Sequence, residues 1–368
     1  MQDKAIKECP SSRTKLFEVI ETMRFPLIFL VVIIHMVGFD SPRIDFNGGA
    51  WSLYIFISEM FSHNLGRIAI PLFFIFSGYF FFRKLAEWTW DGYATQLKKK
   101  VKTLLIPYLF WNLTIVGVTL TLTYLTAYLG MNREIGTTSS LYDIFWGMPA
   151  NFPLWYMRDL MCMMVLSPLL YLFIRYAKAW GMLCLLVVYL YCLEMGIPGL
   201  STTAFFFFML GGYFAIFNKD VIVFCGRYKK VLAVFTLLLL FNATLLNGTA
   251  YHEYAVRVFI IAGVMSAINL FNYLLRYPKL KQRLLSLSAS TFFIYVVHEI
   301  YIINWLKGGF SRLPIAQSPW GMLVGYFVIP CICLLICWGL YKILKKIAPG
   351  FLSFVTGGRI VSNVKKRN

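Results

Sequence analysis

The sequence predicts an all-α integral membrane protein, and three observations carry this prediction. Residues of the types AVILMFWYC make up 59% of the 368 positions. Charged residues make up 14%, against about 25% in soluble domains. The third observation is the sorting of basic residues described below. Too few polar groups are present to cover a surface in water. Disorder, a fibre and a disulfide scaffold are excluded, and a multi-pass membrane protein is favoured over a soluble enzyme.

Ten windows of about 20 mostly apolar residues are long enough to cross a bilayer as helices. The ten expected spans are 18–39, 60–82, 103–126, 154–175, 180–196, 202–217, 231–247, 255–275, 289–306 and 320–343. The connections between them are too short to form a further domain. We therefore expect one multi-pass domain over residues 1–368, with an N-terminal segment at 1–17 and a basic tail at 344–368.

The net charge of +19 comes from 35 basic and 16 acidic residues. In a soluble protein this excess would suggest a nucleic-acid partner. If the N-terminus is cytoplasmic and the spans alternate, 27 basic residues fall in cytoplasmic segments and 5 in outer ones. Short cytoplasmic loops of membrane proteins carry such an excess. We therefore expect both termini to be cytoplasmic, and no nucleic-acid partner.

Two ionisable residues in the first expected span, Arg24 and His35, are candidates for function. Ionisable groups are costly inside a membrane and commonly mark functional sites. Eleven residues of helix correspond to three turns plus about 20°, so the two side chains share one face about 16 Å apart. Arg24 can hold an anion entering from the cytoplasm, and His35 can act as a general base. Alternatively, Arg24 snorkels to the headgroups and His35 hydrogen-bonds a neighbouring helix.

A second set of polar residues surrounds the start of the second span. Glu59, His63 and Arg67 follow at intervals of four residues and share a helix face. They form either part of a functional site or a row of side chains whose charges pair with one another at the membrane interface. Shortly after them, Ser77-Gly78 allows close approach of another helix.

Three later spans contribute further candidates. Trp155 suits the outer interface, and Arg158 with Asp159 lies one turn deeper. Glu253 and Arg257 are spaced for an ordinary i, i+4 pair. His298 and Glu299 are adjacent, and because neighbouring helical residues point about 100° apart, at least one faces the bundle interior.

Several motifs are missing from the sequence. It contains no HExxH, no P-loop, no GxGxxG after a strand and no GxSxG. The four histidines have no spacing that proposes a zinc site. We therefore expect neither a metal nor a tightly bound cofactor.

An ordered set of motifs resembles the integral-membrane acyltransferase family 3. The set comprises Arg24-x10-His35, Arg67-x3-Pro71-Leu72-Phe73-Phe74 with Ser77-Gly78, Pro107-x3-Trp111, Leu154-Trp155-Tyr156 with Arg158-Asp159-Leu160, and Phe293-Ile294-Tyr295 leading to His298-Glu299. The resemblance covers most of the chain. It implies O-acyl transfer from a cytoplasmic acyl-CoA, usually acetyl-CoA, to a hydroxyl of a polysaccharide, glycolipid or lipid-linked sugar. It also implies a bacterial inner-membrane location, with membrane lipids as surroundings. Some members of the family carry an appended extracytoplasmic esterase-like domain; because the sequence ends in a basic tail, we expect none here.

The resemblance selects Arg24 and His35 as the catalytic signature. The residues expected to bind substrate or acyl-CoA are Arg67, Arg83, Lys84, Glu59, His63, Trp155, Arg158, His298 and Glu299. Arg83 and Lys84 serve equally well as plain cytoplasmic anchors. Basic groups near the cytoplasm, with a general base further along the same helix, suit an acyl-CoA that enters a pore lengthwise, with its phosphates near the cytoplasm and its thioester near the base.

We expect His35 to deprotonate the acceptor hydroxyl, which attacks the thioester. Asp40, Asp45 and Glu59 are candidates to orient His35, and a route through acyl-His35 is an alternative. Ten helices with buried Arg, His and Glu also describe a secondary transporter. The acceptor, the acyl group and the oligomeric state are left open by the sequence.

Overall fold

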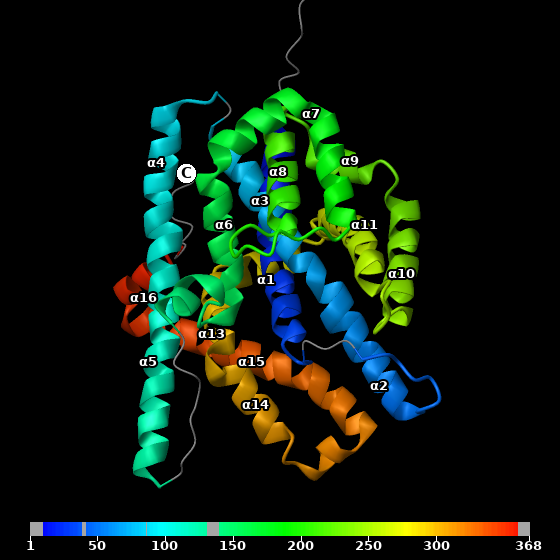
Figure 1. Ribbon diagram of the computed structural model, residues 1–368, viewed down its shortest axis with the longest axis vertical. Coiled ribbons are helices and arrows are strands. Elements are labelled where there is room, and N and C mark those ends of the chain that lie inside the picture. Colours follow the sequence, from blue (N-terminus) through cyan, green and yellow to red (C-terminus); the bar gives the residue numbers. More distant parts are fainter. Residues whose placement is uncertain (1–9, 39–41, 86, 131–139, 360–368) are drawn as a thin grey trace, which may run out of the picture.

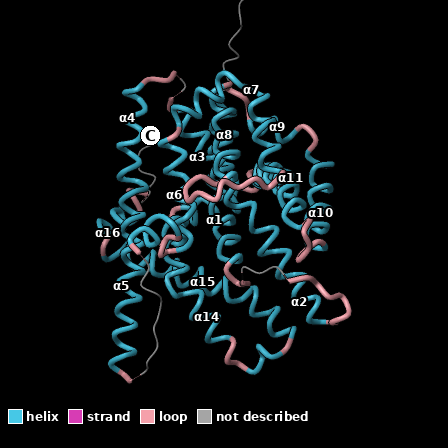
Figure 2. The backbone as a smooth tube through the Cα atoms, in the orientation of Figure 1, coloured by secondary structure: helices cyan, strands magenta, loops and turns pink. Residues whose placement is uncertain are grey.

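The computed structural model describes residues 10–38, 42–85, 87–130 and 140–359, and these residues form helices and loops without a strand (Figures 1 and 2). The α-helices are α1 Pro10–Ile34, α2 Ala50–Glu59, α3 Ala69–Arg83, α4 Trp90–Lys100, α5 Ile106–Tyr128, α6 Trp155–Val165, α7 Ser167–Leu190, α8 Thr202–Ile216, α9 Val221–Gly226, α10 Lys229–Leu245, α11 His252–Leu274, α12 Pro278–Ser288, α13 Thr291–Val297, α14 Ile303–Phe310, α15 Pro319–Ile347 and α16 Pro349–Val355. The short π-helical segments are η1 Met60–Asn64, η3 Val101–Leu105, η4 Asp143–Gly147 and η6 His298–Ile302, and the 3₁₀ segments are η2 Leu65–Ile68, η5 Phe152–Leu154 and η7 Pro314–Gln317.

All ten expected spans coincide with helical residues, although their boundaries differ. Five helical segments in the described part are long and apolar enough to cross a membrane: Ala50–Arg83, Trp90–Tyr128, Ser167–Leu190, His252–Leu274 and Pro319–Ile347. The pair Pro278–Ser288 and Thr291–Phe310, bent by 49°, makes a sixth if it is one span. The architecture fits an all-α membrane protein. Ten spans and two cytoplasmic termini stay predictions.

Helix α7 contains a break that separates two of the expected spans. Lys178 has φ 49° and ψ −133°, which is not a helical conformation. The spans expected at 154–175 and 180–196 lie on either side of it. Figure 1 shows the corresponding arch in the ribbon of α7.

Helix α1 lies in the middle of the bundle, where it contacts α11, α12, α13 and α15 (Figure 1). Its side chains are buried on several faces; Val19, Met23 and Val32 are fully buried. The first half carries charges that neighbouring helices neutralise, since Lys281 of α12 lies 2.7 Å from Glu18. Protein therefore surrounds α1 on several sides, which allows it to carry ionisable residues at membrane depth.

Helices α3 and α8 approach each other so closely that their backbones touch at two glycines. A Cβ added at Gly78 would lie 2.0 Å from the carbonyl oxygen of Phe208, and one at Gly211 would lie 2.0 Å from that of Ile75. The close approach expected at Ser77-Gly78 is confirmed. It fixes α3, which carries one wall of the site described next.

Candidate active site

His35 lies one residue beyond the end of α1. Its backbone N–H donates to the carbonyl of Val32 at 3.2 Å, so the chain turns here instead of continuing the helix expected to 39. Ser62 in η1 holds this end by donating to the carbonyl of Ile33 at 2.8 Å. Lys307 of α14 donates to the carbonyl of His35 at 2.6 Å. The position of His35 is therefore fixed by three separate elements.

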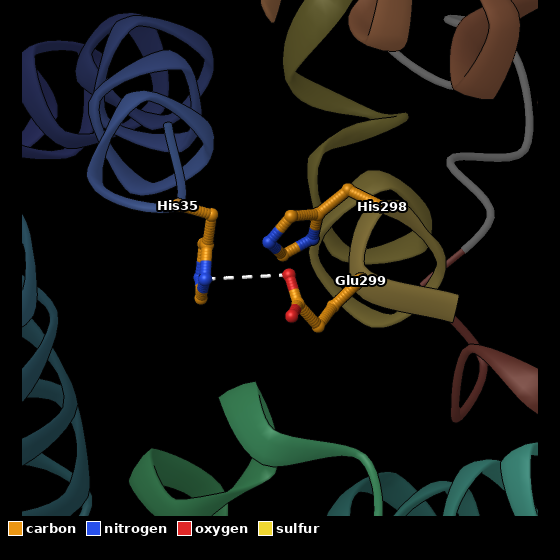
Figure 3. A group of neighbouring side chains, drawn as sticks. All are labelled: His35, His298 and Glu299. Carbon is orange, nitrogen blue, oxygen red and sulfur yellow. Dashed lines mark ion pairs between the residues drawn. The ribbon is translucent and has the colours of Figure 1, made fainter. Parts of the chain in front are cut away.

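Glu299 is the carboxylate that faces His35. His35 Nδ1 lies 3.3 Å from Glu299 Oε2, and both side chains are largely buried (Figure 3). Of the three candidates expected from sequence, Glu59 and Asp45 do not fill this place. Glu59 contacts His63 and Asn247, at 2.5 and 2.6 Å. Asp45 is exposed, and Asp40 lies outside the described residues.

His298 completes the group of three side chains in Figure 3. Its ring lies 5.1 Å from the His35 ring, centroid to centroid, and it is fully buried, as expected for one of the pair at 298 and 299. His298 Nδ1 donates to the carbonyl of Ile294 at 3.0 Å, which leaves Nε2 without a hydrogen-bond partner among the described residues. This nitrogen therefore carries a free lone pair.

His298 and Glu299 lie at the start of an irregular stretch of helix. His298 and Glu299 open the π-helical segment η6, in which Ile300 and Tyr301 depart from helical angles and Tyr301 has φ 60°. Bulges and non-glycine residues at positive φ are costly and often occur at functional sites. The hydroxyl of Tyr301 contacts Thr119 Oγ1 at 2.6 Å and so anchors the strained turn.

The same three side chains have the donor set of a metal site. One atom each of His35, His298 and Glu299 lies within 4.8 Å of the others. Two imidazoles and a carboxylate suit zinc. The expectation of no metal stays a prediction, which the chelator experiment in the Discussion tests.

A cavity of about 390 Å³, here called the His35 cavity, opens beside His35. Its polar lining residues include His35, Ser62, His63, Arg67, Trp155, Thr203, Glu253 and Arg257. Three of the residues expected to bind substrate, His63, Arg67 and Trp155, thus share one cavity with His35. Glu59 is buried behind it and holds His63.

The arginines of the His35 cavity pair across elements rather than along a helix. Arg67 donates to both carboxylate oxygens of Glu253, at 2.7 and 2.9 Å. Arg257 donates to Glu194 and to the carbonyl of Tyr189, both at 2.7 Å. The expected i, i+4 pair of Glu253 and Arg257 is therefore wrong. A bidentate ion pair between two elements, such as that of Arg67 with Glu253, fixes the relative position of its side chains better than an ion pair on the surface of one helix does.

A second cavity of about 230 Å³, here called the Arg24 cavity, lies along the same face of α1, nearer the N-terminus of the helix. Its polar lining residues are Glu21, Arg24, Ser77, Tyr156, Ser288, Thr291, Tyr295 and Arg359. Arg24, Ile28 and Val31 of α1 line this cavity, while Val31, Ile34 and His35 line the other. The expectation that Arg24 and His35 project from one side of the first span agrees with this lining.

The two cavities are neighbours that share three lining residues, here called the junction. Val31, Ile70 and Tyr295 line both of them. The hydroxyl of Tyr295 donates to the carbonyl of Pro153 and is thereby held by the protein itself. Apolar surface thus joins an arginine at one end to a histidine at the other.

Comparison with known proteins identifies the family. The profile of an acyltransferase domain matches residues 17–342. The chain belongs to acyltransferase family 3. It is also similar to the succinoglycan biosynthesis protein ExoH of Rhizobium meliloti (strain 1021), with 27% identity over 362 residues that cover 92% of each chain. No solved structure matches the chain significantly.

Six of the nine residues expected to bind substrate in this acyltransferase line neither cavity: Glu59, His298 and Glu299, placed above, and Arg158, Arg83 and Lys84. Arg158 is buried and donates to Asp159, and to the carbonyls of Trp146 and Gly147. Arg83 lies at the end of α3 and donates to the hydroxyl of Tyr79, and Lys84 follows it, exposed. Sequence reasoning did not anticipate that Arg359 lines the Arg24 cavity. The sequence signal for Arg359 is a basic residue shortly after an apolar C-terminal helix. Because the whole segment 344–368 is basic, this arginine did not stand out from its neighbours.

Proposed function

We propose that this acyltransferase moves an acyl group from cytoplasmic acyl-CoA to a hydroxyl of a polysaccharide, glycolipid or lipid-linked sugar. The adjacency of the two cavities, which share three lining residues, is the observation that carries the proposal. The donor enters the Arg24 cavity, and the acceptor hydroxyl enters the His35 cavity. The acyl group passes between them at Val31, Ile70 and Tyr295. Acetyl-CoA is the donor we propose first.

The length of the donor fits the distance between the two functional residues. The pantetheine arm, from pyrophosphate to sulfur, has as many backbone bonds as about four extended residues, which reach about 14 Å. From Arg24 to Ile34, at the end of α1, ten helical steps rise about 15 Å, and His35 follows in a turn. The long side chain of Arg24 shortens this span. A donor held by its phosphates near Arg24 therefore brings its thioester close to His35.

The lining of the His35 cavity suits a polyhydroxyl acceptor. Arg67 with Glu253 and Arg257 with Glu194 provide charged hydrogen-bonding groups, and Trp155 offers an aromatic surface. Ligand sites commonly combine apolar walls with a few placed polar groups. The similarity to a protein named for succinoglycan biosynthesis supports a saccharide acceptor.

The reaction we propose is a direct transfer. The neutral imidazole of His35 takes the proton of the acceptor hydroxyl, and the oxygen attacks the thioester carbonyl. The new ester bond forms as the carbon–sulfur bond breaks, and the CoA thiolate takes the proton from the imidazolium. Glu299 holds the ring in place and stabilises its charged form. His298 packs against the ring and limits its rotation.

Purified protein in lipid nanodiscs, supplied with acetyl-CoA and a polysaccharide acceptor, tests the proposal. We expect acceptor-dependent release of free thiol and, by mass spectrometry, one added acyl group per thiol released. A secondary transporter would instead show uptake into vesicles without consuming the thioester, and that result would overturn the proposal. Succinyl-CoA, assayed in parallel, decides which acyl group the enzyme prefers.

A further inference from the structure

The Arg24 cavity contains more positive than negative charge. Arg24 and Arg359 both line it, whereas Glu21 is the sole carboxylate in its described lining. Glu21 is already engaged, because Arg24 lies 2.9 Å from one of its oxygens and Ser288 donates to the other at 2.9 Å. Within the described parts of the chain no carboxylate pairs with Arg359. Among the described residues, one guanidinium of this cavity thus has no counter-charge.

Arg359 is held firmly in place despite lacking an acidic partner. It donates to the carbonyl of Thr356 at 2.9 Å, and its guanidinium carbon lies 3.9 Å from the centroid of the Phe292 ring. Gly357 and Gly358 have φ 64° and 77°, a conformation that favours glycine. A Cβ at Gly357 would also lie 2.7 Å from the carbonyl oxygen of Thr103. The double-glycine turn therefore returns the chain against η3 and presents Arg359 to the cavity.

The charge on Arg359 is disfavoured by its surroundings. Burial, and then the neighbouring Arg24, lower the pKa of Arg359 to about 10. Burying a charge without a partner is expensive. A bound anion between the two arginines would relieve both the desolvation and the repulsion.

Thr291 is a second, independent sign of a ligand. Its side chain lines the cavity and is 93% buried, and its hydroxyl has no hydrogen-bond partner among the described residues. Buried hydroxyls without a partner are uncommon in native proteins. A hydroxyl can donate to an anionic oxygen.

We propose that Arg359 and Arg24 together bind a phosphate group of the acyl-CoA donor, and that Thr291 donates a further hydrogen bond to it. This inference rests on the proposed function. Guanidinium groups bind phosphate through paired, charge-assisted hydrogen bonds. A phospholipid headgroup has the same chemistry. The Arg24 cavity shares Val31, Ile70 and Tyr295 with the His35 cavity, and this adjacency to the proposed base favours the donor.

Two donors that differ only in the phosphate-bearing part test the site. Arg359→Gln raises KM for acetyl-CoA by about 10-fold or more, the loss expected for a hydrogen bond to a charged group. The same variant leaves kcat/KM for S-acetylpantetheine, which lacks the pyrophosphate and nucleotide, within about 2-fold of the original. Arg359→Lys retains part of the affinity. The matched control is Arg283→Gln, which removes an exposed arginine of α12 and changes neither value.

A binding measurement that needs no turnover separates this inference from the proposed function. CoA alone raises the thermal unfolding midpoint of the original protein, and Arg359→Gln abolishes most of that rise. Without ligand the variant unfolds at the same or a higher temperature, because a repulsion between like charges is removed. An Arg359-dependent rise without acyl transfer to any acceptor would refute the proposed function and leave the phosphate site standing.

Three results would overturn the phosphate site. One is an equal loss with both donors, which would show a structural role for Arg359. Another is an unchanged response of Arg359→Gln to CoA. The third is a thermal unfolding midpoint that CoA does not change but that is higher in phosphatidylglycerol nanodiscs than in phosphatidylcholine nanodiscs, with the difference depending on Arg359. That result would assign the site to a lipid headgroup.

Discussion

The contact between Glu299 and His35 predicts a large and specific loss of activity in Glu299→Gln. During the transfer His35 becomes an imidazolium, 3.3 Å from Glu299 Oε2. At an effective dielectric constant of 20 this pair is worth about 5 kcal/mol. An ionised acceptor makes a hydrogen bond roughly twice as strong as a neutral one, so the amide keeps about half of that energy. The remaining loss of about 2.5 kcal/mol corresponds to a decrease in kcat of about 70-fold.

The assay is thiol release from acetyl-CoA at saturating acceptor, with purified variants that elute as a single species in size-exclusion chromatography. Asp45→Asn is the matched control, because Asp45 is an exposed carboxylate that the sequence also offered as a partner for His35. We expect this control to stay within about 2-fold of the original kcat. Retention of near-original kcat in Glu299→Gln, or a loss in Asp45→Asn of the same size, would refute the assignment of Glu299.

Three further predictions follow from the cavities and the helix packing. Ile70→Trp fills the junction of the two cavities, and we expect it to abolish acyl transfer while the CoA-induced thermal shift persists. Ile70→Leu is the control and should stay active. Transfer by Ile70→Trp at the original rate would contradict passage of the acyl group at this junction. Gly78→Ala places a Cβ against the backbone of Phe208 and should cost about 1–3 kcal/mol of stability, whereas Gly117→Ala, with open space around it, should be neutral or stabilising in the same thermal unfolding experiment. Excess EDTA should leave turnover unchanged, because we assign His35 to proton transfer and His298 and Glu299 to holding its ring. A loss of turnover that zinc restores would instead make the three residues metal ligands.

Local signals in the sequence predicted the elements that the site uses. Long apolar windows located helical residues at all ten expected spans, because membrane burial requires continuous apolar stretches with internally bonded backbones. The spacing of Arg24 and His35 placed both on the side of α1 that lines the two cavities. The Ser77-Gly78 pair predicted a close helix approach. Each of these features depends on residues within one segment.

Partners that are distant in the sequence could not be predicted. Nothing near position 35 points to Glu299, and the two meet only because α1 packs against α13, which leads directly into η6. Arg67 and Glu253 were both visible in the sequence, yet local spacing paired Glu253 with the wrong arginine. An i, i+4 interval shows only that two residues share a helix face, and a better-aligned partner on another helix can prevail.

The central claim is that His35 carries out acyl transfer, and His35→Ala tests it most directly. Surface glycans of cells that produce the original protein, the variant or neither are compared by mass spectrometry, with equal amounts of protein in the membrane. We predict that the acyl group appears on the glycan with the original protein alone. Acylation by His35→Ala at near-original levels would contradict the account.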